Sequence, residues 1–307
     1  MEQTKGVRGR FAPSPSGRMH LGNLWSCLLA WLSARSAGGS MVLRLEDLDP
    51  DRCKMEYCDQ VMRDLEWLGL DWDGQPMYQS QRAEAYAQAF HKLEEQGLIY
   101  PCYCTRAERL AASAPHRSDG IVIYDGRCRR LSAEEKETLS QTRRPAWRVQ
   151  VPEKTITFCD LLQGKYEQDL SRACGDFILR RSDGVYAYQL AVIVDDAAMG
   201  VTQVVRGSDL LDSTPRQLWL QEALGLPQPE HAHVPLLLAP DGRRLAKRDR
   251  DLELGQLQAT YTAPELVGRL AHAAGLIPEY APVTPAELVG QFDWRKVPRE
   301  DLVLKLG

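Results

Sequence analysis

The sequence predicts an α/β protein in which helices cover a parallel sheet and an insertion interrupts the pattern. Three observations lead to this fold class. Strand and helix signals alternate through the first hundred residues, the alternation returns after residue 185, and a stretch bearing cysteines and arginines separates the two parts. Alternation of this kind is typical of parallel strands joined by crossover helices.

The composition is that of a folded globular chain. Of the 307 residues, 44% are hydrophobic and 26% are charged, which excludes a disordered, collagen-like or coiled-coil protein. The net charge of −4 excludes a uniformly basic nucleic-acid coat but is compatible with a local basic patch. Neither a signal peptide nor a membrane span is evident, so we expect no membrane partner. Eight cysteines in a long chain are too sparse for a disulfide scaffold and favour a reducing cytoplasm, and we expect a monomer.

Residues 1–99 carry the first half of the expected sheet. They begin with a strand signal and a loop rich in proline and glycine, and apolar residues then recur at helical spacing until Gly38 and Gly39 stop the helix. The expected elements are a strand at 7–12, a helix from about residue 24, a strand near 41–45, and helices over about 51–68 and 81–96.

Residues 100–184 have a different character and are interpreted as an insertion. The segments 147–151 and 156–158 are β-like, and Asp183-Gly184 indicates a turn.

The α/β pattern returns over residues 185–250. A helix is expected to open with Thr214 as its N-cap and to end before Gly225. Residues 251–307 indicate short amphipathic helices separated by prolines such as Pro264.

A first candidate motif joins the first expected strand to the first helix: Arg10-Phe-Ala-Pro-Ser-Pro-Ser-Gly-Arg-Met-His20-Leu-Gly22-Asn23. A strand-to-helix turn points backbone N–H groups and the positive helix end at an anion. Gly22 would admit a nucleotide base or ribose close to the backbone, and His20 could donate a hydrogen bond to a phosphate. Taken alone, His20 is more simply an ordinary surface histidine.

A second candidate motif follows the apolar run 234–238: Asp241-Gly-Arg-Arg-Leu-Ala-Lys247-Arg-Asp249. A basic loop after a strand can neutralise a triphosphate, with Lys247 as a compact positive charge. By itself, the motif is more simply a solvated basic loop.

Together the two motifs resemble the HIGH and KMSKS signatures of class I aminoacyl-tRNA synthetases. Further segments resemble the glutamyl branch of that family: Arg10-Phe-Ala-Pro-Ser14, Leu45-Glu-Asp-Leu-Asp-Pro50, Tyr188-Gln-Leu-Ala, Val194-Asp-Asp and Val205-Arg-Gly. The resemblance runs in the family's order over about residues 8–249. It departs at Ala246, where the second signature has serine, and at Arg244, where it has its first lysine.

The resemblance implies a class I, Rossmann-type catalytic domain with a zinc-bearing insertion and a short helical C-terminal segment. Residues 1–99 and 185–250 would be the two halves of that domain. The implied nucleotide substrate is ATP with Mg²⁺, bound by Pro13, His20, Gly22, Asn23 and Lys247. His20 and Lys247 are the expected catalytic residues, because they would stabilise the phosphate that is transferred.

A charged pocket is expected at the ends of the strands. A dicarboxylate amino acid needs two cations and, for its ammonium group, one anion. Arg10 and Arg206 end expected strands, where open α/β sheets bind ligands, and Glu46 ends another. In the family that this sequence resembles, the positions of Arg10, Ser14, Glu46, Tyr188 and Arg206 hold L-glutamate. Singly, Glu46 or Arg206 would be read as an exposed charge.

Three cysteines and a tyrosine form a candidate metal site in the insertion, as Cys102-x-Cys104 and Tyr124-x-x-x-Cys128. Three thiolates and a fourth donor make a closed tetrahedral zinc site, and three buried thiols without metal are the alternative. The glutamyl-queuosine tRNA(Asp) synthetases, which this sequence closely resembles, use this arrangement for one structural Zn²⁺ with tyrosine as the fourth ligand. His116 is the competing fourth ligand.

That resemblance implies activation of L-glutamate by ATP without tRNA, followed by transfer of glutamate to the queuosine base of tRNA(Asp). Only residues 252–307 follow Asp251, too few for the anticodon-binding domain of a full glutamyl-tRNA synthetase. The alternatives are a minimal synthetase that charges tRNA(Glu), a non-catalytic paralogue acting as a binding module and, with less support, another HxGH nucleotidyltransferase.

Overall fold

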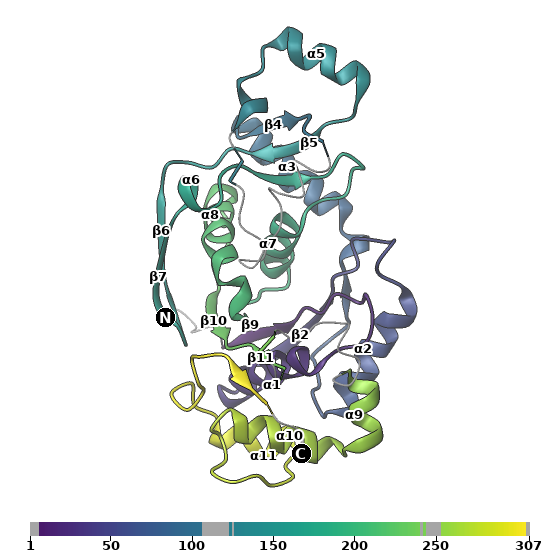
Figure 1. Cartoon of the computed structure of the whole chain (residues 1–307), viewed down its shortest axis with the longest axis vertical. Coiled ribbons are helices and arrows are strands. Elements are labelled where there is room, and N and C mark those ends of the chain that lie inside the picture. The colour runs from purple at the N-terminus through teal and green to yellow at the C-terminus, as the bar shows by residue number, and fades with distance from the viewer. Residues whose placement is uncertain (1–5, 106–122, 125, 240–241, 244–252, 305–307) are drawn as a thin grey trace.

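The structure is a computed structural model that describes residues 6–105, 123–124, 126–239, 242–243 and 253–304. The molecule is elongated (Figure 1). The strands β4 and β5 lie with helix α5 toward one end, the helices α9, α10 and α11 lie at the other, and a parallel sheet lies between them.

The predicted parallel sheet is present as two adjoining sets of strands. The first is a three-stranded set of parallel strands, β1 (Arg8–Phe11), β2 (Ser40–Leu45) and β3 (Met77–Tyr78). The second contains the parallel pair β9 (Gln203–Gly207) and β10 (Glu230–Val234). The sets meet where the Thr202 backbone N–H donates to the Arg8 carbonyl at 3.0 Å.

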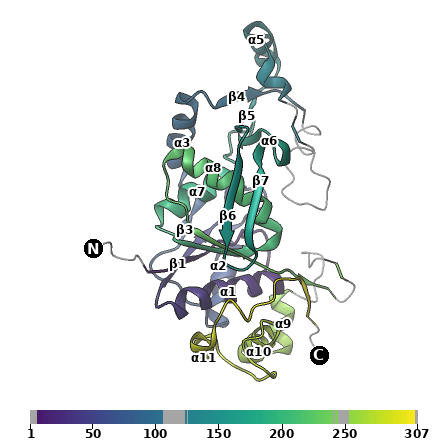
Figure 2. The ribbon, with the colours of Figure 1, turned by 90° about the vertical axis from the view of Figure 1, so that its left-hand side faces the viewer.

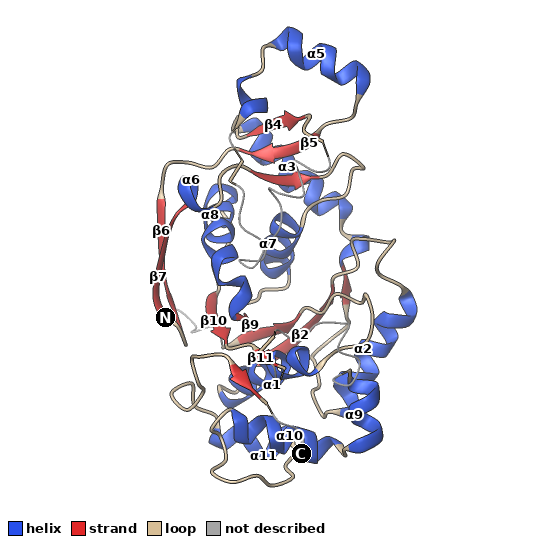
Figure 3. Ribbon diagram, viewed as in Figure 1, coloured by secondary structure: helices blue, strands red, loops and turns tan. Residues whose placement is uncertain are grey.

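Helices pack on both sides of these strands. In Figure 3, α1 lies below the strands and α7 and α8 lie above them. The helices of this part of the chain are α1 (Leu21–Ser36), α2 (Met55–Trp67), α3 (Ala83–Glu95), α7 (Tyr188–Ala198) and α8 (Thr214–Leu224). Short 3₁₀ segments precede two of them: η1 (Gln79–Gln81) before α3 and η4 (Ser208–Ser213) before α8.

The start of α8 differs from the prediction by one residue. Ser213 is the N-cap and Thr214 is the first helical residue, with Pro215 in the first turn. Proline suits this turn because its missing N–H would have no partner inside the helix. The predicted end is confirmed, since Gly225 caps the helix in the left-handed region at φ 66°.

The segment predicted as an insertion contains an antiparallel sheet and a hairpin. The sheet consists of β4 (Ile99–Cys102), β5 (Ala146–Val149) and β8 (Phe177–Arg180). The hairpin consists of β6 (Thr155–Asp160) and β7 (Gly164–Asp169), which run side by side along the molecule (Figure 2). Its helices are η3 (Arg127–Arg130), α5 (Ala133–Thr142) and α6 (Leu170–Ala173).

The hairpin also joins the parallel sheet. Asp160 at the end of β6 pairs with His231 of β10, so this part of the predicted insertion extends the sheet of the α/β unit. The segment boundaries at residues 99, 184 and 250 stay predictions.

The last part of the described chain is helical, as predicted. Its elements are α9 (Leu254–Thr260), α10 (Ala263–Ala273), α11 (Pro285–Leu288), η6 (Val289–Gln291) and the short strand β12 (Leu302–Val303). Pro264 lies in the first turn of α10 instead of separating two helices. Strand β12 pairs in parallel with β11 (Leu237–Leu238), which follows β10. Among the described helices, none is long and apolar enough to cross a membrane.

Candidate active site

The predicted charged residues meet where the parallel strands end. Arg10 lies in β1, Arg206 lies in β9, and Glu46 follows β2 directly. Strands β1 and β9 adjoin, with β2 beyond one of them and β10 beyond the other. This is the point of an open α/β sheet at which the strand order reverses and ligands bind. Tyr188, at the start of α7, contacts Arg206 there, with 3.4 Å between its hydroxyl and Nη1.

Arg44 and Asp196 join these residues into one buried network. The Arg44 guanidinium is fully buried and donates to Asp196 Oδ1 at 2.5 Å and to Glu46 Oε1 at 3.2 Å. Arg10 donates through Nη1 to the Val205 carbonyl at 2.9 Å, and its buried Nε lies 3.8 Å from Asp196 Oδ1 without a hydrogen-bond partner. The network therefore has donor capacity that the described residues do not use.

The charges of this buried network favour an anionic ligand. The guanidinium groups of Arg10, Arg44 and Arg206 lie close together, and the carboxylates of Glu46 and Asp196 lie beside those of Arg10 and Arg44. Burial raises the pKa of Glu46, and the charges of Arg44 and Arg10 oppose that rise. Burial lowers the pKa of Arg10, against the effect of Asp196. Arg10 and Glu46 are thus shielded from solvent, and their charged forms depend on stabilisation by neighbouring charges. A charged ligand bound here would add to that stabilisation.

Arg206 is positioned by His233, a residue that was not identified from the sequence. Its Nε donates to His233 Nε2 at 3.1 Å, and its Nη2 donates to Thr214 Oγ1 at 2.7 Å. On the other side of the ring, His233 Nδ1 lies 2.6 Å from an oxygen of Asp160. Burial lowers the pKa of His233 to about 4 although Asp160 opposes this, so the ring is neutral at pH 7 and accepts from Arg206.

Pro13 and Ser14 lie in the loop between β1 and α1. The Pro13 carbonyl accepts from the Glu46 backbone N–H at 3.0 Å, which holds this loop against the end of β2. Ser14 is exposed, and its carbonyl accepts from the Ser16 backbone N–H at 2.8 Å. The structure thus brings the loop to the pocket, while a contact between Ser14 and a ligand stays a prediction.

His20 is the N-cap of α1. Its Nδ1 accepts from the Gly22 backbone N–H at 3.1 Å, while its own backbone N–H donates to Asn23 Oδ1 at 3.1 Å. The Gly22 N–H is therefore used inside the helix terminus, while close approach of a nucleotide base or ribose to Gly22 stays a prediction. With Nδ1 as acceptor, neutral His20 carries its proton on Nε2, the nitrogen that can donate to a phosphate.

Gly22 also makes room for the His20 ring. A Cβ atom at this position would lie 3.1 Å from His20 Cε1 and Nδ1. Glycine at position 22 therefore leaves room for the His20 ring that caps the helix. This role of Gly22 was not predicted from the sequence.

Part of the second candidate motif is outside the described residues, namely Asp241 and positions 244–249 with Arg244, Ala246 and Lys247. The chain re-enters the described structure beside the first motif, since Glu253 forms an antiparallel bridge with His20 and the Leu254 N–H donates to the Met19 carbonyl at 2.9 Å. Glu253, four residues beyond the end of the second motif, therefore lies beside the first motif, while the shared phosphate site stays a prediction.

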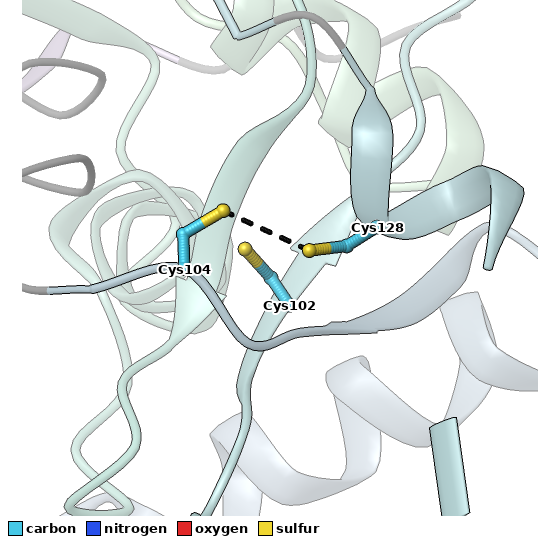
Figure 4. Close-up of side chains that lie close together, drawn as sticks. All are labelled: Cys102, Cys104 and Cys128. Carbon is cyan, nitrogen blue, oxygen red and sulfur yellow. Dashed lines mark hydrogen bonds between the residues drawn. The ribbon is translucent and has the colours of Figure 1, made fainter. Parts of the chain in front are cut away.

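The predicted thiols form a buried cluster (Figure 4). The Sγ atoms of Cys102, Cys104 and Cys128 lie within 4.8 Å of one another, and those of Cys104 and Cys128 are 3.7 Å apart. The Tyr124 hydroxyl lies 3.7 Å from Cys102 Sγ and 3.6 Å from Cys104 Sγ. His116, the competing ligand, is outside the described residues.

These spacings match a tetrahedral metal site. Bond lengths of about 2.3 Å to sulfur and about 2.0 Å to oxygen place two thiolates about 3.8 Å apart and a thiolate and an oxygen about 3.5 Å apart. Burial raises the pKa of Cys104 to about 12. For Cys102, burial acts in the same direction, but a hydrogen bond from Arg148 brings the pKa below its ordinary value. Three thiols and a phenol thus lie close enough together to be metal donors.

A family model matches most of the chain. It describes the catalytic domain of class I tRNA synthetases of the E and Q type, and it matches residues 6–278.

Two curated relatives are both named glutamyl-Q tRNA(Asp) synthetase. The protein from Nitratidesulfovibrio vulgaris is 50% identical, and the alignment covers 97% of this chain and 95% of the relative. The protein from Symbiobacterium thermophilum is 50% identical, with 95% and 94% covered. Among solved structures, a glutamate tRNA ligase from Elizabethkingia meningosepticum in complex with its amino acid superposes with a TM-score of 0.82 at 28% identity, over 97% of this chain and 67% of that chain.

We predict that Asp196→Asn destabilises the fold much more than the loss of an exposed carboxylate. The change removes a charge from the buried network around Arg44, and breaking a buried pair costs about 3–5 kcal/mol. The control is Asp183→Asn. The Asp183 carboxylate pairs with Arg181, and about half of each side chain is exposed. We therefore expect the control to lower the free energy of unfolding by less than about 1 kcal/mol. Urea unfolding measures both, and equal losses would contradict the buried role of Asp196.

Proposed function

The chain belongs to the class I tRNA synthetases of the glutamyl and glutaminyl type, and from that premise we propose that it transfers L-glutamate to the queuosine base of tRNA(Asp). The single observation that carries the substrate proposal is the buried network in which Arg10, Arg44 and Arg206 lie with the carboxylates of Glu46 and Asp196. Glutamate has two carboxylates and one ammonium group, so its net negative charge suits the pocket. The names of the relatives support queuosine in tRNA(Asp) as the acceptor.

In the first step the α-carboxylate of glutamate attacks the α-phosphate of ATP in line, forming glutamyl-adenylate and releasing pyrophosphate. Arg10 and Arg206 neutralise the carboxylates, Glu46 holds the ammonium group, and Tyr188 and Ser14 complete the pocket. This reaction needs positioning and charge stabilisation more than a side-chain base. In the second step a hydroxyl of the queuosine base attacks the activated carbonyl and displaces AMP.

The nucleotide binds between the two signature motifs. His20 donates from Nε2 to the phosphates, Lys247 supplies a positive charge, and the loop with Pro13, Gly22 and Asn23 contacts the rest of ATP. Mg²⁺, when bound with ATP, neutralises phosphate charge. The bridge between Glu253 and His20 supports this arrangement, because Glu253 lies only six residues after Lys247 in the sequence.

The insertion holds one structural Zn²⁺ through Cys102, Cys104, Cys128 and Tyr124. The spacing of the donor atoms supports this proposal. Four protein donors close the coordination sphere, so the metal stabilises the fold of the insertion and takes no part in the transfer.

Residues 1–99 and 185–250 are proposed as the catalytic domain, 100–184 as the zinc-bearing insertion and 251–307 as the helical C-terminal segment. The proposed enzyme is a monomer and works in the cytoplasm, where ATP, glutamate and tRNA are present.

The acceptor is tested with radiolabelled glutamate, ATP and purified tRNA(Asp) with or without queuosine. We predict that only the queuosine-containing tRNA is labelled, and that removing its 3′-terminal adenosine leaves the labelling intact because the base lies in the anticodon loop. Labelling of tRNA(Glu) that depends on its 3′-terminal adenosine would instead identify a minimal glutamyl-tRNA synthetase. No labelling of any tRNA would favour a non-catalytic paralogue.

The zinc ligands are tested by metal analysis of purified variants. We predict about one zinc per chain in the wild type and in His116→Ala, and loss of zinc in Cys104→Ser. Tyr124→Phe is expected to weaken zinc binding, because it removes the phenol oxygen and keeps the ring. Full zinc retention in Tyr124→Phe with loss in His116→Ala would assign the fourth position to His116.

A further inference from the structure

Arg148 lies in β5 directly beside the thiol cluster, and its side chain is fully buried. Its Nε donates to Cys102 Sγ at 3.2 Å, and its Nη1 donates to the backbone carbonyl of Asp176 at 2.7 Å. The guanidinium carbon lies 3.8 Å from the centre of the Tyr124 ring. Arg148 thus contacts two of the proposed zinc ligands at once, and its buried Nη2 has no hydrogen-bond partner among the described residues.

A buried guanidinium needs a negative charge nearby, because removing a cation from water costs several kcal/mol. In the described part of the chain, no carboxylate lies within 4.0 Å of the Arg148 guanidinium. The carboxylate of Asp176 accepts from the Tyr100 hydroxyl at 2.7 Å and from the Val151 backbone N–H at 2.9 Å, and it pairs with Arg129 at 3.4 Å. Among the described residues, the group that the Arg148 Nε contacts and that can carry a negative charge is therefore the Cys102 thiol of the cluster.

We propose that Arg148 is the counter-charge and positioning residue of the zinc site. With Zn²⁺ bound, three thiolates and a neutral phenol would leave a net charge of −1 on the site, and a phenolate would leave −2. The buried guanidinium would offset part of that charge, and its hydrogen bond orients Cys102. This inference rests on the proposed zinc. Mutating a residue that is hydrogen-bonded to a metal ligand typically lowers metal affinity 10–100-fold.

The test compares the zinc affinity of Arg148→Met and Arg148→Lys with that of wild type by competition with a chromophoric chelator. We expect affinity to fall about 10–100-fold for methionine, which removes the charge. The loss should be smaller for lysine, which keeps the charge but not the planar donor group. Arg180→Met is the matched control, because Arg180 lies in the neighbouring strand β8 with its guanidinium 5.3 Å from the Tyr186 ring. Its affinity should equal that of wild type.

Thermal unfolding with and without zinc separates this role from a purely structural one. If Arg148 only fills space, its replacement lowers the melting temperatures of the zinc-free and zinc-loaded proteins equally and leaves the zinc-dependent increase unchanged. That result, or an unchanged zinc affinity, would overturn the proposal. The proposal predicts a smaller zinc-dependent increase for Arg148→Met than for Arg180→Met.

A second measurement tests the same role without Arg148→Met, in case that variant does not fold. Co²⁺ is loaded into wild type and Arg148→Lys, and the sulfur-to-cobalt charge-transfer band reports on the thiolates. A shifted band supports the hydrogen bond to Cys102, and an identical band contradicts it. A wild type that binds no zinc would refute the zinc site itself, whereas equal zinc binding in all variants would refute only the role of Arg148.

Discussion

The pocket depends on the buried pair between Arg44 of β2 and Asp196 of α7. Asp196 also faces Arg10, and Arg44 also holds Glu46, so one pair connects strand β1, strand β2 and helix α7. Unpaired buried charges are costly, and each group therefore limits the positions that the others can adopt. Because each charged side chain limits the positions of the others, the network is expected to be rigid, as a site for a small charged substrate requires.

The residue next to Asp196 extends the same constraint to helix α3. Asp195 is fully buried and accepts from Gln79 at 2.9 Å and from the Tyr86 hydroxyl at 2.6 Å. The two neighbouring aspartates of α7 therefore hold the charged network on one side and η1 with α3 on the other. Asp160 makes a second connection, from the β6–β7 hairpin through His233 to Arg206.

Much of this arrangement could be predicted from local patterns. Alternating apolar residues identify the strands, and charges where those strands end place Arg10, Glu46 and Arg206 together, because parallel strands end at one edge of a sheet. The short spacing of Cys102 and Cys104 likewise suggested the cluster. Arg44 had a signal that was not used: it precedes Glu46 by two residues, so both side chains lie on one face of the strand.

Other features depend on pairings that local patterns do not encode. The hydrogen bond from Arg44 to Asp196 joins residues 152 positions apart, and the one between Asp160 and His233 spans 73. Such partners are determined by how the hairpin and α7 pack, and hydrophobic periodicity carries no information on that packing. The capping role of His20 was missed for a different reason, since histidine is not among the usual N-cap residues.

The most direct measurement is ATP–pyrophosphate exchange without tRNA, run with L-glutamate, L-glutamine or L-aspartate. We predict exchange with glutamate and none with glutamine or aspartate. We also predict that Arg206→Leu lowers kcat/KM for glutamate at least about thirtyfold, because the carboxylate that it neutralises loses its buried charge partner. Replacing the half-exposed Arg181 with leucine should change little. Exchange that is equal with glutamine, or unaffected by Arg206→Leu, would contradict the charged pocket as the glutamate site.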